Sequence, residues 1–75
     1  MRKKIYIELT SERMFIHGRK DDVEFIINNW IEEEFIIYYY ISNVYEGIAI
    51  EAPRDQLYTI LTNISNDVEN EIHLI

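Results

Sequence analysis

Residues 5–31 read IYIELTSERMFIHGRKDDVEFIINNWI, and this stretch decides the fold. Over residues 3–9, isoleucine and leucine alternate with polar or aromatic residues, which is typical of a strand with one buried face. The polar segment 10–13 predicts a hairpin turn, and residues 14–17 predict the returning strand. Gly18 then breaks the strand pattern. The stretch therefore predicts a β-hairpin that leads directly into a helix.

The helix is predicted to begin at Asp21, a good N-cap residue with Glu24 at the spacing of a capping box. Glu32, Glu33 and Glu34 oppose the helix dipole at the other end, so we expect the helix to fray there. Between these limits, apolar residues recur at helical spacing and predict a face turned toward a core. They are Val23, Ile26, Ile27, Trp30 and Ile31.

The second half of the chain repeats this pattern. Residues 35–41 are rich in β-formers, Ser42 and Asn43 predict a turn, and a strand follows over about 45–51 with Gly47 as a bulge. Pro53 opens a second helix, and residues 71–75 predict a short closing strand. Aligned without gaps, residues 5–32 and 39–66 share seven identical pairs, which favours a duplicated unit.

These patterns predict a single domain over residues 1–75 of the α+β class. We expect a two-layer sandwich, an antiparallel sheet with two helices on one face, in the order β-β-α-β-β-α-β. Its two halves cover about 3–34 and 35–67. If residues 14–17 form only a loop, the order becomes β-α-β-β-α-β, the ferredoxin-like arrangement. Both alternatives predict the same core: Ile5, Ile7, Leu9, Ile16, Ile26, Ile27, Trp30, Ile37, Tyr39, Ile41, Ile48, Ile50, Leu57, Ile60, Leu61, Ile64 and Leu74.

The chain has 14 acidic and 7 basic residues, a net charge of −7. Such a surface repels phosphate backbones and attracts basic proteins, so we expect no nucleic-acid partner. The longest apolar stretch, 35–41, is too short to span a membrane, and residues 5–9 alternate too strictly for a signal peptide. Cysteine is absent, which fits a reducing compartment. We expect a cytoplasmic protein without membrane association.

Motifs that carry chemistry are missing from the sequence. His17 and His73 have no further ligands at metal spacing, and we expect both to be ordinary surface residues. The serines lack a strained, glycine-flanked turn, and two glycines cannot form a phosphate-binding loop. The sequence therefore predicts a non-enzymatic protein with no metal and no cofactor.

The aromatic residues suggest an interface. If Phe35, Ile37, Tyr39 and Ile41 face the helices, the intervening side chains lie on the opposite sheet face together with Phe15. Exposed aromatic clusters are typical of partner surfaces, and acids beside them attract basic partners. The predicted protein-interface residues are Tyr6, Ile36, Tyr38, Tyr40, Glu32, Glu33 and Glu34.

The first hypothesis is a small acidic protein-binding module that regulates or inhibits a partner, either a basic protein or a second copy packed sheet to sheet. A narrower version is an inhibitor encoded by a phage or mobile element that blocks a basic, nucleic-acid-binding protein. Two other classes stay open. They are a small-molecule-sensing regulatory domain and a structural homo-oligomeric component.

Overall fold

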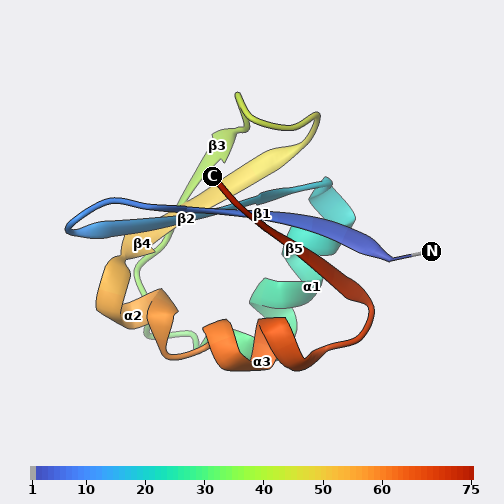
Figure 1. Cartoon of the computed structure of the whole chain (residues 1–75). Coiled ribbons are helices and arrows are strands. Elements are labelled where there is room, and N and C mark those ends of the chain that lie inside the picture. Colours follow the sequence, from blue (N-terminus) through green and yellow to red (C-terminus); the bar gives the residue numbers. More distant parts are fainter. Residues whose placement is uncertain (1) are drawn as a thin grey trace.

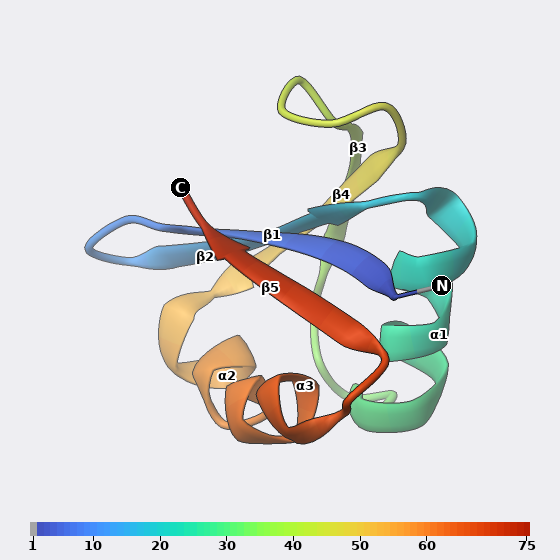
Figure 2. The ribbon, with the colours of Figure 1, turned by 45° about the vertical axis from the view of Figure 1, so that its right-hand side comes forward.

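The computed structural model describes residues 2–75. The strands form one sheet in the order β3-β4-β2-β1-β5, and the helices lie together on one of its faces (Figures 1 and 2). The protein is therefore a small α+β domain with a mixed five-stranded sheet. In chain order the elements are β1 (Lys3–Leu9), β2 (Arg13–Gly18), α1 (Lys20–Trp30), β3 (Tyr38–Ile41), β4 (Ile48–Pro53), α2 (Arg54–Tyr58), α3 (Leu61–Asn66) and β5 (Asn70–Leu74).

The sheet is not purely antiparallel, and that prediction is wrong at one edge. β1 pairs antiparallel with β2, β2 with β4, and β4 with β3. β5 instead pairs parallel with β1. The reason is the connection: β4 already runs parallel to β1, and a helical crossover returns the next strand in the same direction. Asn70 anchors the start of β5 to α3, because its buried side-chain amide donates a hydrogen bond to the Ile64 carbonyl oxygen at 2.9 Å.

The observed order is β-β-α-β-β-α-α-β, which differs from the predicted order at the second helix. Residues 13–18 form a strand, so the ferredoxin-like order that omits it is not observed. The second helix is divided at Thr59, whose hydroxyl donates to the Gln56 carbonyl at 3.0 Å. The Ile60 N–H bonds to the Leu57 carbonyl only three residues back, at 3.1 Å. This tight turn ends α2 and starts α3 in a new direction.

The beginning of α1 also differs from the prediction. The helix starts at Lys20, and Arg19 occupies the N-cap position without a side-chain hydrogen bond. Asp21 is therefore not the cap. Asp21 and Asp22 lie in the first turn, where their charges interact favourably with the helix dipole.

The core lies between the sheet and the three helices. Leu9, Tyr39, Ile41 and Leu74, which we predicted to be buried, are exposed. α1 packs beneath β1, β2 and β4, so β3 extends beyond the helical layer and its side chains stay uncovered. Leu9 and Leu74 lie at strand ends. The buried core residues are Ile5, Ile7, Met14, Ile16, Val23, Ile26, Ile50, Ala52, Leu57, Ile60 and Ile64, of which the predicted core lacked Met14, Val23 and Ala52.

The second hairpin is shorter than predicted. β3 begins at Tyr38 rather than residue 35, because residues 35–37 carry the chain from the end of α1 to the sheet edge. A turn in which the Phe35 N–H donates to the Glu32 carbonyl at 3.0 Å starts this passage. β4 begins at Ile48 rather than residue 45, and residues 42–47 form a loop that rises above the sheet (Figure 1).

Candidate protein interface

The sheet face opposite the helices, called the outer face below, carries aromatic and charged side chains in two rows. The strand registers align the first row across five strands and the second across four. Every second residue of a strand points to the same face, so these side chains are neighbours. The first row is His73, Tyr6, His17, Ala49 and Tyr40, and the second is Glu8, Phe15, Glu51 and Tyr38.

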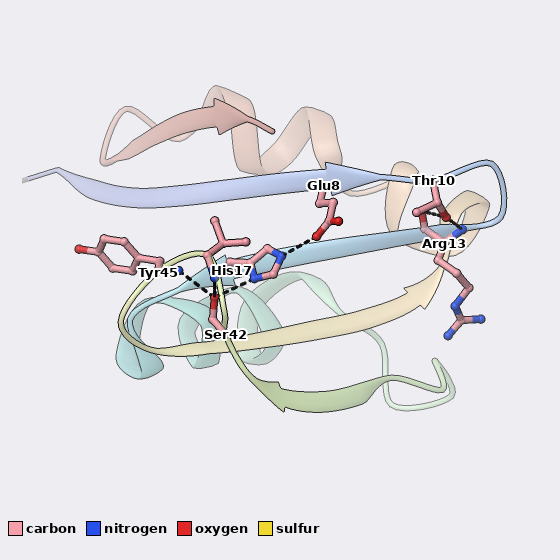
Figure 3. Close-up of polar contacts among 7 residues, drawn as sticks. Glu8, Thr10, Arg13, His17, Ser42 and Tyr45 are labelled. Carbon is pink, nitrogen blue, oxygen red and sulfur yellow. Dashed lines mark hydrogen bonds and ion pairs between the residues drawn. The ribbon is translucent and has the colours of Figure 1, made fainter.

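His17 lies at the centre of the outer face and is only 3% exposed, so the prediction of an ordinary surface histidine is wrong. Its Nδ1 lies 2.9 Å from Ser42 Oγ, and its Nε2 lies 3.1 Å from Glu8 Oε1 (Figure 3). β2 supplies the histidine, β1 the glutamate, and the loop after β3 the serine. Three separate segments therefore meet at this one ring.

The hydrogen bonds of Ser42 determine the tautomer of His17. Ser42 Oγ accepts the backbone N–H of Val44 at 3.1 Å and that of Tyr45 at 3.0 Å. Both lone pairs of the Ser42 oxygen then accept hydrogen bonds, so the Ser42 hydroxyl is the donor in the hydrogen bond to His17 Nδ1. His17 Nε2 therefore carries the ring hydrogen and donates a hydrogen bond to Glu8. This arrangement fixes the orientation of the ring.

A serine, a histidine and a carboxylate in line are also the parts of a nucleophilic triad. Here, however, the serine oxygen caps the turn of its own loop through two backbone N–H groups. A nucleophilic hydroxyl must instead be free to attack a carbonyl carbon. We therefore interpret the chain of hydrogen bonds as the structure that holds the 42–47 loop against the sheet.

Glu51 is the second carboxylate of the outer face. It pairs with Arg13 Nε at 2.6 Å and accepts the hydroxyl of Tyr40. The Tyr40 hydrogen bond, helped by Arg13, holds the pKa of Glu51 below its usual value, while the same bond raises the pKa of Tyr40. The Arg13 guanidinium also lies 5.8 Å from the centre of the Tyr38 ring, so Tyr38, Arg13, Glu51 and Tyr40 form one connected group.

A pocket of ≈ 430 Å³ opens between these two networks. His17 and Ala49 line it, as do the rings of Phe15 and Tyr40 and the carboxylates of Glu8 and Glu51. Glu8 and Glu51 flank Phe15 on neighbouring strands, so they are roughly 10 Å apart across two strand spacings. Arg13 pairs with Glu51 beside the pocket, so the two carboxylates and this guanidinium together carry one negative charge.

The other end of the outer face is an aromatic stack. The Tyr6 ring centre lies 4.9 Å from that of His73 and 5.1 Å from that of Tyr45. His73 Nε2 lies 2.7 Å from Glu71, and this contact holds the pKa of Glu71 below its usual value. Tyr45 comes from the 42–47 loop, so the loop contacts the outer face at two points, Tyr45 on Tyr6 and Ser42 on His17.

The structure brings only part of the predicted interface together. Tyr6, Tyr38 and Tyr40 lie on the outer face. Ile36 lies in the loop before β3 and is exposed. Glu32, Glu33 and Glu34 follow α1, and two of them line a hollow with Ile27 and Tyr39 on the helical side of the sheet. A hydrogen bond between Glu32 and Glu34 raises the pKa of Glu32 and lowers that of Glu34. These acids do not border the aromatic cluster.

Five residues of the site escaped prediction from sequence: Glu8, Arg13, His17, Ser42 and Glu51. Alternation along residues 3–9 places Glu8 on the outward side of its strand. Alternation along residues 14–17 places His17 on the same face of the sheet. Their pairing, however, depends on the register between β1 and β2. The position of Ser42 depends on a loop whose path local sequence does not determine.

Among residues 2–75, no group of three or more potential metal ligands converges, and no helix is long and apolar enough to cross a membrane. Fold and site together define a class, a small α+β domain with a structured outer sheet face. Comparisons with protein-family models, with curated proteins and with solved structures give no match for this chain.

Proposed function

We propose that the protein is a non-enzymatic binding module whose outer-face pocket accepts a cationic side chain of a basic partner protein. The observation that carries the proposal is the position of Glu8 and Glu51 on either side of Phe15. A guanidinium over the Phe15 ring would contact the aromatic face and lie between two carboxylates. Tyr40 and His17 close the sides of this pocket.

The charge of the whole chain supports the same type of partner. A net charge of −7 attracts a basic surface over a long range and speeds encounter at low ionic strength. Arg13 already neutralises part of Glu51, whereas the Glu8 side chain is 40% exposed and contacts His17. Of the two pocket carboxylates, that of Glu8 is therefore the more available to a partner.

A regulatory role follows from this binding mode. A basic protein that uses its cationic surface to bind nucleic acid would lose that surface on association with this chain. Inhibition by occupation of the surface needs no catalysis, which agrees with the structural role assigned to Ser42. The narrower hypothesis of an inhibitor acting on a nucleic-acid-binding protein is a special case of this proposal.

The test uses a hexa-arginine peptide as probe and amide chemical shifts as the readout. At about 20 mM NaCl we expect shifts that localise to Glu8, Phe15 and Glu51 and that weaken steeply at about 300 mM NaCl. The double variant Glu8→Gln, Glu51→Gln should lose these localised shifts. The control Glu33→Gln, Glu69→Gln removes the same number of charges from exposed positions elsewhere. Equal binding by both variants would refute the pocket.

A second pair of substitutions tests the aromatic walls. Tyr38→Ser with Tyr40→Ser should weaken peptide binding at least tenfold while the thermal unfolding transition stays cooperative, because both rings are about half exposed. Unchanged binding by this variant would show that the tyrosines do not contribute to the interface.

A further inference from the structure

β3 is an edge strand that nothing in residues 2–75 covers. It is the first strand in the order β3-β4-β2-β1-β5 and lies at the border of the sheet in Figure 3. All four of its residues, Tyr38–Ile41, are exposed, and Ile41 is 90% exposed. None of the four is charged. Edge strands are normally protected from pairing by short length, charges, proline, bulges or covering segments, and of these β3 has only its length of four residues.

The hydrogen-bond pattern of the hairpin shows which backbone groups of β3 point outward. The Ser42 N–H donates to the Gly47 carbonyl at 3.1 Å, in the register that pairs Tyr40 with Ala49. In an antiparallel ladder, hydrogen-bonded pairs alternate with pairs that are not bonded to each other. Tyr38 and Tyr40 therefore bond to β4, whereas the N–H and C=O groups of Tyr39 and Ile41 point away from the sheet.

We infer that β3 pairs antiparallel with β3 of a second copy of this chain, which joins the two sheets into one. With Tyr40 opposite the partner's Tyr40, each Tyr39 lies opposite the partner's Ile41. All four outward-pointing residues then exchange hydrogen bonds across the two-fold axis. A shift of this register by one residue in each chain would require Ile37, which lies outside the strand.

Side-chain pairing favours a second copy over other occupants. In this register, an exposed aromatic ring lies beside an exposed β-branched side chain, one of the more favourable cross-strand pairs. Tyr40 meets its own counterpart on the outer face. The strand thus supplies both halves of each contact, whereas a basic peptide would find no charge on β3 to pair with.

The opposite edge of the sheet does not have these properties. β5 carries Glu71 and His73 on its outer side, and Asn70 is buried at its start. Charged residues on an edge strand discourage pairing with another chain. Association through β3 therefore gives a closed dimer rather than an open filament.

The dimer contact shares Tyr40 and Ile41 with the rim of the proposed pocket, but the salt dependence of association distinguishes the two proposals. Two chains of net charge −7 repel each other, so dimerisation should strengthen as salt rises, whereas binding of a basic partner weakens. Because two short strands form the contact, we expect weak association, with a Kd on the order of micromolar to hundreds of micromolar.

The test measures sedimentation equilibrium from about 10 µM to about 1 mM protein, at low and high salt. We expect a monomer–dimer equilibrium that shifts toward dimer with salt. Tyr39→Lys should weaken dimerisation at least tenfold. The control Tyr58→Lys changes a tyrosine of similar exposure on α2, 52% against 60%, and should leave the dimer unchanged.

Amide hydrogen exchange identifies the contact independently of any variant. Protection of the Tyr39 and Ile41 amides should rise with protein concentration, while that of the Tyr40 amide, bonded within the hairpin, stays constant. The inference is overturned if the wild type stays monomeric over the whole range at high salt, if both lysine variants behave alike, or if larger oligomers form instead of dimers.

Discussion

Replacement of Ser42 by alanine tests the network that organises the outer face. The substitution removes one oxygen that takes part in three hydrogen bonds: it accepts from Val44 and Tyr45 and donates to His17. No other side chain among residues 2–75 bonds to His17 Nδ1. The change should therefore loosen the 42–47 loop and leave the buried histidine with an unpartnered nitrogen.

The cost follows from the exposure of each group. Val44 is exposed, so its N–H finds water and contributes little. The Tyr45 N–H is partly buried and the His17 ring is buried, and each unpartnered group costs about 1–3 kcal/mol. Because water can enter at the loop, we take the lower end for each and expect a loss of about 2–3 kcal/mol. A domain of 75 residues has a total stability of about 4–11 kcal/mol.

Urea unfolding followed by fluorescence measures this loss, because the single tryptophan, Trp30, packs against the core. The midpoint of thermal unfolding should fall by roughly 10–20 °C. Ser65→Ala, at an exposed position of α3, is the matched control and should change stability by less than about 0.5 kcal/mol. Ser42→Thr keeps a hydroxyl and should retain most of the stability. A Ser42→Ala protein as stable as the Ser65→Ala control would refute the role assigned to the network.

Two further predictions concern stability. Gly47→Ala should lower the free energy of unfolding, measured in urea, by at least about 2 kcal/mol, because the added Cβ would overlap the Gly18 carbonyl oxygen. Gly18→Ala should lower it less, because the Cβ added there meets only contacts of 3.2–3.4 Å. The pKa of Glu51 is lower in the folded protein than its ordinary value of 4.5, so the ionised carboxylate stabilises the fold at pH values above 4.5. This contribution to stability disappears as the pH falls through the folded-state pKa. The advantage of the wild type over Tyr40→Phe, followed by unfolding from pH 7 to pH 3, should therefore shrink on acidification; a constant difference would contradict this.

The periodic elements of the fold could be predicted because local pattern determines them. Alternation in residues 3–9 gives β1, and the apolar stripe of residues 23–30 gives α1. The parallel pairing of β5 could not be predicted in this way, since it depends on the path of the crossover. The division of the second helix falls at a tight turn at Thr59 and Ile60, which the helical spacing of the apolar residues does not report. The exposure of Tyr39 and Ile41 depends on how far α1 extends under the sheet, which no local pattern reports.

The candidate site was harder to predict because its residues look ordinary in sequence. Tyr6, Tyr38 and Tyr40 follow from alternation alone, and the structure places them on the expected face. Glu32, Glu33 and Glu34 stand close to Tyr38 in sequence, yet the passage through residues 35–37 separates them onto the other side of the sheet. Proximity along the chain therefore misleads wherever a connection crosses from one layer to the other.

The second hairpin carries most of what distinguishes the outer face. The two halves of the chain place strands and helices in the same order, but three residues connect β1 to β2, whereas six connect β3 to β4. The longer connection supplies Ser42 and Tyr45, whose contacts hold the loop over His17 and Tyr6. A bare sheet face would leave His17 in water. Its burial shows that the chain builds a structure on the face that the helices leave open, and the pocket between Glu8 and Glu51 lies beside that structure.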